Sequence, residues 1–556
     1  MRQSRQLSRR HFTFGGAIGL ASIAMSQSYN AVVAAGMRAS HDSAPTATVS
    51  AVPSQTMQGF GAAGAWWPHD LVHFNPEVQE HVADLLFGPD GINLSAYRYN
   101  VGGGGVGITN PVRAPETFLV SPGRYDWTRD PGGRRFLSLA AERGVPALIG
   151  FVNSAPSIWT TNGLNRGGYL QPGTESDYAR YLTDVVSHFH EAEGITLSYL
   201  SPMNEPDHLF SEGGQEGMGV PVEQRAPVIQ AIGQELAARA PYCRVIADES
   251  SRVGEQFIRE VGQWLEVPGT AEYVAALAHH RYDFPNDITI ELARELAERY
   301  DKPLWFTEIC CFDTRTGIFG PQYDPTIRGA LMMANLIWQG LTQANDAAFH
   351  WWVACSSALG IDPSQDPDAV AQVNEDGWND GLLYYDPNYA ENGNQRIYPT
   401  KRYYAMGNFS RYVRPGARRH DVIGTPRNLR VMAFANGPIG PTDGARAQRP
   451  TSPIATPPAQ RPTAAGPIRA TDEDGAARGW TIVVINNAPL DAPSTTLHLQ
   501  LPGTEFHQLT VSTAVETSTD LNLEPAPAPH VSDTVLLTAH VAAQSITTYV
   551  LLDTEL

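Results

Sequence analysis

The sequence predicts an α/β fold: a (β/α)8 TIM barrel with an appended small β-sandwich domain. From about Gly59 to Tyr412, short apolar runs alternate with helical patterns, and eight such units are typical of a closed parallel barrel. After Tyr412, strand-like runs follow one another without helices between them, as in a sandwich. The chain has 556 residues, of which 42% are hydrophobic, so it is long enough for both domains and their cores.

Eight apolar segments each have the length of one barrel strand. They are Met57–Ala62, Asn93–Asn100, Val145–Val152, Thr196–Met203, Arg244–Glu249, Tyr273–His280, Lys302–Glu308 and Ala347–Val353. Helical stretches lie between them, such as Ser176–Ala192, in which apolar side chains recur at the 3.6-residue period. We therefore expect a catalytic barrel over residues 59–411, with the active site at the C-terminal ends of its strands.

The sandwich is predicted from strand-like runs on both sides of a Pro- and Ala-rich stretch. Runs at Asn428–Ala435 and Trp480–Asn487 flank residues 437–478, which have almost no large apolar side chains and are interpreted as a flexible insertion. Thr46–Val52, ahead of the barrel, is a candidate strand of the same domain. Further strand-like runs are Thr495–Leu501, Phe506–Ser512 and Ile546–Leu552.

Residues 1–35 have the pattern of a targeting segment. Arg9 and Arg10 precede a mild apolar run that is too short to cross a bilayer, since a spanning helix needs about 20 residues. Val33-Ala34-Ala35 then offers a cleavage site. The paired arginines resemble the twin-arginine signal that exports folded proteins, and an ordinary secretory signal is the alternative. In either case we expect a secreted, extracellular protein without a membrane span in its mature form.

Charge and aromatic content narrow the class of partner. Lys and Arg number 39 against 58 Asp and Glu, and the formal net charge of −19 disfavours binding to nucleic acid or to anionic membranes. The 11 Trp and 21 Tyr supply flat faces that suit apolar or sugar surfaces. Sugars or apolar surfaces are therefore the favoured partners, and we expect a monomer.

The four cysteines are too few for a disulfide scaffold. Cys310 and Cys311 are adjacent, while Cys243 and Cys355 lie far from them in sequence. A Cys311–Cys355 bridge would require their strands to be neighbours, and buried free thiols are the expected state.

Two predicted strands end in a glutamate at the catalytic face. The fourth leads into Asn204-Glu205-Pro206, and the seventh ends at Glu308. An acid at the end of a buried strand costs free energy unless it is hydrogen-bonded or solvated, so it needs a reason. Two such acids across a barrel mouth fit glycoside hydrolysis, in which one protonates the leaving oxygen and the other attacks the anomeric carbon or activates water. A pair of surface glutamates at loop starts is the alternative.

These residues resemble the retaining glycosidases built on (β/α)8 barrels, and further segments resemble glycoside hydrolase family 30. The segments are Gln58-Gly59-Phe60-Gly61, Arg98-Tyr99-Asn100, and Lys401-Arg402-Tyr403-Tyr404 ahead of Phe409-Ser410. Those that look most like the family's endo-β-1,6-galactanase branch are Gly64-Ala65-Trp66-Trp67, the stretch from Arg98 to Gly103, and Asn153-Ser154-Ala155-Pro156. The resemblance covers about Thr46 to the C-terminus apart from residues 437–478, and it implies that residues 46–58 and 412–556 form the sandwich together.

The resemblance implies a role for individual residues. Glu205 matches the family's general acid/base, Glu308 its nucleophile, and Asn204 the side chain that holds the substrate's 2-hydroxyl. Arg98, His280 and Tyr282 match positions that surround the nucleophile. A cation there keeps Glu308 ionised, while apolar neighbours raise the pKa of Glu205 so that it stays protonated. For Arg98, a structural ion pair is the alternative.

Aromatic side chains near strand ends are candidate sugar platforms. Trp351, on the eighth strand, is expected to stack under the sugar at the cleaved bond, with core packing as the alternative. Further candidate platforms follow strands one and three: Trp66, Trp67 and Trp159. For each of them, packing in the protein core is the alternative. Asn153, after strand three, is a further substrate-binding candidate. The long loop from Ala354 to Pro399 is acidic and aromatic, and we interpret it as a cleft wall.

No cofactor and no metal are expected. Gly102–Gly107 satisfies G-x-G-x-x-G, but Asn110-Pro111 and Pro115 follow where a dinucleotide site needs a helix. His279 and His280 are neighbours in a strand and point to opposite faces, and no Cys, His and Asp cluster completes a metal site.

The resemblance implies an exported endo-β-1,6-galactanase that acts on arabinogalactan side chains by double displacement. Retention predicts carboxyl groups about 5–5.5 Å apart. The alternatives keep the chemistry but act on β-1,6-glucan or xylan, or release sugars as an exo-acting enzyme. A non-catalytic polysaccharide-binding protein is an alternative from another class.

Overall fold

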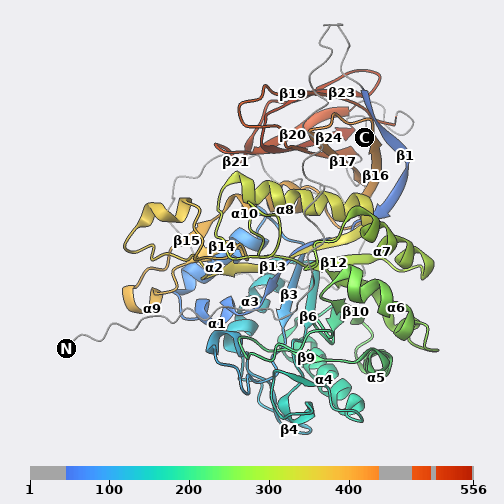
Figure 1. Ribbon diagram of the computed structural model, residues 1–556, viewed down its shortest axis with the longest axis vertical. Coiled ribbons are helices and arrows are strands. Elements are labelled where there is room, and N and C mark those ends of the chain that lie inside the picture. Colours follow the sequence, from blue (N-terminus) through green and yellow to red (C-terminus); the bar gives the residue numbers. More distant parts are fainter. Residues whose placement is uncertain (1–45, 437–478, 503–508, 554–556) are drawn as a thin grey trace, which may run out of the picture. The chain divides into compact units, whose positions relative to one another are not determined.

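The structure, a computed structural model, describes residues 46–436, 479–502 and 509–553 (Figure 1). The expected targeting segment (residues 1–35) and the Pro/Ala-rich insertion (residues 437–478) lie outside the described residues. Within the described ranges, no helix has both the length and the apolar character needed to cross a membrane.

Eight parallel strands close into a barrel, and each of the eight predicted segments overlaps one of them (Figure 1). β13 pairs with both β12 and β2, so the eight parallel strands form a closed ring. In barrel order the strands are β2 (Gly59–Gly64), β3 (Ala96–Asn100), β6 (Ala147–Phe151), β8 (Tyr199–Ser201), β10 (Arg244–Ser250), β11 (Val274–His280), β12 (Leu304–Glu308) and β13 (Asp346–Ser356).

Helices cover the outside of the barrel. In α4 the side chains of Tyr178, Leu182 and Phe189 are buried, which is the face that the 3.6-residue period predicts, and the helix ends at Gly194 with φ 69°. The α-helices are α1 (Trp67–Leu71), α2 (Pro76–Phe87), α3 (Pro131–Glu142), α4 (Glu175–Glu193), α5 (Val222–Arg239), α6 (Ile258–Leu265), α7 (Asp287–Arg299), α8 (Ile327–Gln339), α9 (Tyr389–Asn392) and α10 (Lys401–Ser410). Short helical turns are η1 (Pro111–Arg113), η2 (Ser157–Trp159), η3 (Val253–Phe257), η4 (Ala271–Tyr273), η5 (Gly340–Ala344) and η6 (Pro367–Ala371).

Short strands decorate the loops of the catalytic face. The segment after β13, expected to be a long loop, contains β14 (Gly381–Tyr385), which pairs with the end of β13, and β15 (Ile397–Pro399), which pairs with β14. The wall there is therefore an extension of the barrel sheet. The other short strands are β4 (Leu119–Ser121), β5 (Arg124–Tyr125), β7 (Gly168–Tyr169) and β9 (Met218–Gly219).

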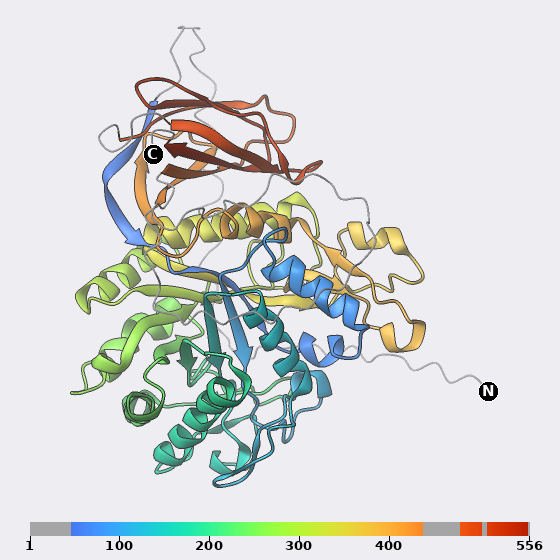
Figure 2. The ribbon, with the colours of Figure 1, turned by 180° about the vertical axis from the view of Figure 1, so that it is seen from behind.

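A second sheet of ten strands folds over on itself as a sandwich. The long β1 (Thr46–Thr56) belongs to both halves, because it pairs antiparallel with β16 and parallel with β19 (Figure 2). Apolar side chains from both halves, such as Ala47, Ile482 and Leu537, share one core. The predicted fold class is thus confirmed. The other strands are β16 (Arg418–Ile423), β17 (Leu429–Asn436), β18 (Gly479–Asn486), β19 (Thr495–Gln500), β20 (Leu509–Thr517), β21 (Asn522–Pro525), β22 (His530–Val531), β23 (Leu536–Val541) and β24 (Ser545–Asp553).

Candidate active site

The C-terminal ends of the barrel strands bring six of the predicted site residues together. Arg98 comes from β3, Asn204 and Glu205 follow β8, His280 ends β11, Tyr282 follows it, and Glu308 ends β12. All of them except the half-buried Tyr282 are buried. Buried polar groups require partners, and the partners here are one another.

Glu308 is held by a cation and a phenol. Its Oε2 accepts a hydrogen bond from Arg98 Nη1 at 2.9 Å, and its Oε1 accepts one from the Tyr282 hydroxyl at 3.0 Å. Arg98 also donates to Asn204 Oδ1 at 3.3 Å, so the amide nitrogen of Asn204 is the end that can donate to a substrate hydroxyl. The guanidinium lies 4.4 Å from the centre of the Phe151 ring. Arg98 therefore neutralises Glu308 and orients Asn204 with the same side chain.

Glu205 lies in a different electrostatic environment. Its main chain has φ 45°, in the left-handed region, and its N–H donates to the carbonyl of Glu249 at 3.0 Å. His280 Nδ1 is 3.0 Å from Oε1 of Glu205. Burial raises the pKa of Glu205 to about 7, even though the hydrogen bond and charge of His280 lower it. Glu205 is therefore able to carry a proton in neutral solution, as a general acid must.

The two acids are close enough for double displacement. One oxygen of Glu205, one oxygen of Glu308 and one nitrogen of His280 all lie within 4.8 Å of one another. Carboxyl groups in retaining glycosidases are about 5–5.5 Å apart, whereas inverting enzymes leave about 6.5–9.5 Å for a water molecule. The nearest oxygens of the two acids are therefore closer to each other than the lower end of the inverting range.

The same three side chains have the donor types of a metal site, so the protonation of His280 matters. Its Nε2 lies 2.9 Å from Glu249 Oε2, and its Nδ1 faces Glu205 and, at 3.7 Å, Glu308 Oε1. Burial alone would lower the pKa of His280, but the three carboxylates outweigh it and raise the pKa to about 10. An imidazolium has no free lone pair. With both ring nitrogens protonated, His280 serves these carboxylates as a hydrogen-bond donor.

Glu249 is a third buried carboxylate of the site, and it is not among the residues predicted from the sequence. It accepts hydrogen bonds from His280 Nε2 and from the Thr307 hydroxyl, and its Oε1 lies 3.6 Å from Arg98 Nη2. Burial would raise the pKa of Glu249, but Arg98 and His280 hold it down at about 2. Its signal in the sequence is the one that singled out Glu205 and Glu308: an acid at the end of an apolar predicted strand.

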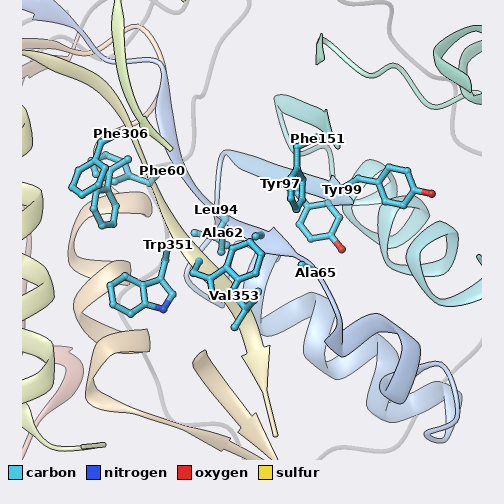
Figure 3. Close-up of a cluster of buried hydrophobic side chains, with 14 of the residues drawn as sticks. Phe60, Ala62, Ala65, Leu94, Tyr97, Tyr99, Phe151, Phe306, Trp351 and Val353 are labelled. Carbon is cyan, nitrogen blue, oxygen red and sulfur yellow. The ribbon is translucent and has the colours of Figure 1, made fainter. Parts of the chain in front are cut away.

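The expected platform Trp351 lies in the core. It is fully buried, its indole N–H donates to the carbonyl of Asp380 at 2.6 Å, and Figure 3 shows it among core side chains such as Phe60 and Phe306. The next residue, Trp352, points the opposite way, because neighbours in a strand alternate between faces. Its ring centre lies 6.3 Å from that of Phe151, which covers Arg98. Trp352 is thus the aromatic of β13 that faces the site.

Two further expected platforms are also core residues. Trp67 packs on Phe136 with ring centres 4.5 Å apart and donates its indole N–H to Ala63. Trp159 packs on Tyr181 with ring centres 5.8 Å apart. Both are more than nine-tenths buried, because each begins or ends a helical turn that packs inward.

Trp66 contacts Trp352, and Asn153 follows β6 at the same end of the barrel. Trp66 is half-buried, with its ring centre 5.0 Å from that of Trp352. Asn153 donates to Asn100 Oδ1 at 3.2 Å, while its own Oδ1 is buried and has no donor among the described residues. That oxygen is able to accept a hydrogen bond from a hydroxyl group.

The cysteines differ from expectation at one pair. Cys310 and Cys311 form a disulfide just after Glu308, and the Tyr282 hydroxyl lies 3.7 Å from Cys310 Sγ. The chain turns out of β12 at Cys311, where φ is 62°, and no strand pattern predicts such a turn. Cys243 and Cys355 are free and buried, as expected.

Known proteins resemble this chain in sequence pattern and in fold. The sequence model of O-glycosyl hydrolase family 30 matches residues 48–362. A conserved exported protein from Bacteroides fragilis has a TM-score of 0.68 and 20% identity, over 91% of this chain and 100% of that chain. The subfamily 8 xylanase Xyn30A from Clostridium acetobutylicum has a TM-score of 0.61 and 20% identity, over 91% of this chain and 99% of that chain. An endo-β-1,6-glucanase has a TM-score of 0.60 and 17% identity, over 91% of this chain and 94% of that chain. At these identities the structural likeness shows the fold.

Proposed function

The chain belongs to O-glycosyl hydrolase family 30, and we propose that it is an exported, retaining endo-β-1,6-galactanase that acts on arabinogalactan side chains. The observation that carries the hydrolase chemistry is the pairing of Glu205 and Glu308 within 4.8 Å. One of these acids is buried beside a histidine, and the other is paired with Arg98. Export rests on the pattern of residues 1–35.

The reaction begins with Glu308 as nucleophile. A Glu308 oxygen attacks the anomeric carbon, the bond to the leaving oxygen breaks, and Glu205 gives that oxygen a proton, which leaves a glycosyl ester on Glu308. Glu205, now a carboxylate, removes a proton from water as the water attacks the same carbon and releases Glu308. Asn204 donates to the 2-hydroxyl, and this hydrogen bond helps only if it tightens as the ring approaches an oxocarbenium ion.

The sugar is assigned from the sequence segments that resemble the endo-β-1,6-galactanase branch, around Trp66, Arg98 and Asn153. Incubation with β-1,6-galactan, β-1,6-glucan and xylan, followed by sizing of the products, tests the assignment. We expect a ladder of oligosaccharides from the galactan alone. A single mono- or disaccharide product would indicate exo action, and turnover of only glucan or xylan would reassign the substrate.

An aromatic row supports endo action. We give this name to Tyr282, Phe319 and Trp378, which lead outward from the nucleophile with ring centres 6.1 Å and 5.6 Å apart. Tyr282 touches Glu308, and Phe319 is 47% exposed. Aromatic faces continuous with the catalytic pair offer binding surface for sugars beyond the cleaved bond, which an endo-acting enzyme needs.

Phe319→Ala should weaken the binding of long substrates and leave that of short ones unchanged. Loss of one stacking contact of about 1 kcal/mol should raise KM for the polymer about fivefold and leave kinetics on an aryl glycoside within about twofold. Ile288→Ala, at an exposed apolar residue on α7, is the matched control and should change neither value. Equal effects of Phe319→Ala on short and long substrates would show that the row does not bind the chain.

Activity should fall as the pH rises through about 7. Glu205 must be protonated for the first step, and its pKa is raised to about 7, so the protonated fraction is lost above that pH. The pH profile of kcat/KM on the polymer should show this alkaline limb. On an aryl glycoside whose leaving group needs no proton the limb should be weak, and in Glu205→Gln it should disappear. A limb that persists in Glu205→Gln belongs to another group.

A further inference from the structure

Glu249 contacts both cationic side chains that hold the catalytic pair, His280 and Arg98. Its Oε2 accepts from His280 and Thr307, and its Oε1 lies 3.6 Å from Arg98, the residue that holds Glu308. Its main-chain carbonyl accepts the N–H of Glu205 at 3.0 Å. The residue is completely buried, with φ 62°, and a non-glycine residue persists in this left-handed region only where its surroundings hold it there.

We propose that Glu249 is a positioning residue of the hydrolysis reaction: it keeps His280 doubly protonated and thereby fixes the Nδ1–H of His280 on Oε1 of Glu205. Oε2 of Glu205 is then the oxygen that gives and takes the catalytic proton. This inference rests on the proposed role of Glu205 as acid/base, and it is independent of which sugar is cleaved.

The arrangement makes chemical sense over the whole cycle. Glu205 alternates between the neutral acid and the carboxylate, and the carboxylate must be stabilised inside a buried site. The His280 imidazolium provides that charge at 3.0 Å. Burial favours loss of the second proton from an imidazolium. The carboxylate of Glu249, 2.9 Å from Nε2, is what keeps that proton on His280. The negative charge of Glu249 therefore acts on Glu205 indirectly, by keeping the His280 ring between them protonated.

Other charges around these three groups remain when Glu249 is changed. They are Asp207 and Glu308 near Glu205, Glu308 and His279 near His280, and Arg98 and His350 near Glu249.

Glu249→Gln tests the proposal because it keeps the shape and removes the charge. His280 should then lose its extra proton near neutral pH, and Glu205 should lose its cationic neighbour, which raises the pKa of Glu205. The alkaline limb of kcat/KM should move to higher pH by about one unit or more, since an opposite charge this close shifts a pKa by about 1–3 units. We expect kcat to fall about tenfold, with KM within about threefold, because the lost contact acts on the reacting state.

Asp248→Asn is the matched control. Asp248 is an equally buried acid one residue earlier on β10, and it is paired with Arg225 and Trp264 away from the site. This variant should lower Tm and leave the pH limb where it is. An unchanged limb in folded Glu249→Gln would overturn the proposal, as would an equal displacement in Asp248→Asn.

The wild-type protein provides a second measurement, should Glu249→Gln not fold. With ¹⁵N-labelled histidine, the ring signals of His280 are identified among the 16 histidines by their loss in His280→Gln. Both nitrogens should remain protonated at pH 9. A neutral His280 ring at pH 7 would overturn the proposal without any substrate, and therefore independently of the proposed function.

Discussion

Glu308→Gln should abolish turnover, with a loss of at least about 10⁴-fold in kcat, because an amide cannot form the glycosyl ester. The fold should survive, since a glutamine oxygen can still accept from Arg98, which also keeps its bonds to Thr307 and Asn204. Initial rates on an aryl glycoside, circular dichroism and Tm check this expectation.

The control for this substitution is Glu77→Gln, at an exposed glutamate in the first turn of α2, which should leave the rate unchanged. Turnover above about 1% in Glu308→Gln would contradict the assignment. If in addition Glu249→Gln were inactive, the nucleophile would have to be sought at Glu249, the other buried acid in contact with Arg98.

Glu205→Ala should produce an effect that depends on the leaving group. Polysaccharide turnover should fall about 10²–10⁴-fold, because the leaving oxygen needs a proton. An aryl glycoside with a good leaving group should still form the ester on Glu308 and then stall, because no base activates water. Added azide should restore turnover and give a β-glycosyl azide, since truncation opens space beside the cationic His280.

Product analysis by NMR identifies the azide anomer. The same azide added to Glu308→Gln should give no β-glycosyl azide, which separates the two roles. An α-glycosyl azide from Glu205→Ala would mean that azide attacks the sugar directly, as in a variant without its nucleophile. That result would contradict the assignment of Glu205 as the acid/base.

The sequence was sufficient for the barrel because buried parallel strands are nearly continuous apolar runs, and each of the eight is bounded by turns and followed by a helical pattern. Glu205 and Glu308 were predicted as the catalytic pair because an acid at the end of such a run is unusual, and the structure brings the two side chains together. His279 and His280 also behave as neighbours in a strand should: His280 faces the acids, while His279 bonds Asp346 at 3.0 Å.

The aromatic platforms could not be predicted in the same way. Trp351 and Trp352 are chemically identical neighbours, and which of them faces the site depends on register. β13 has a bulge opposite β2 between Trp351 and Val353, and an inserted residue of this kind has no signature in the hydrophobic pattern. Glu249 carries the same sequence signal as the two catalytic acids, because it ends a predicted strand. Its role was not predicted, because its main contacts, His280 and Thr307, come from other strands and become visible only once the barrel closes.

The position of β1 affects both folding during synthesis and the design of truncated fragments. This strand is synthesised before the barrel, yet its partners β16 and β19 come only after it. On the ribosome it therefore waits as an unpaired edge, which is a hazard for aggregation. A truncation after α10 would leave β1 without either of its partner strands. We therefore expect that removal of the C-terminal sheet alone does not give the catalytic barrel as a soluble fragment.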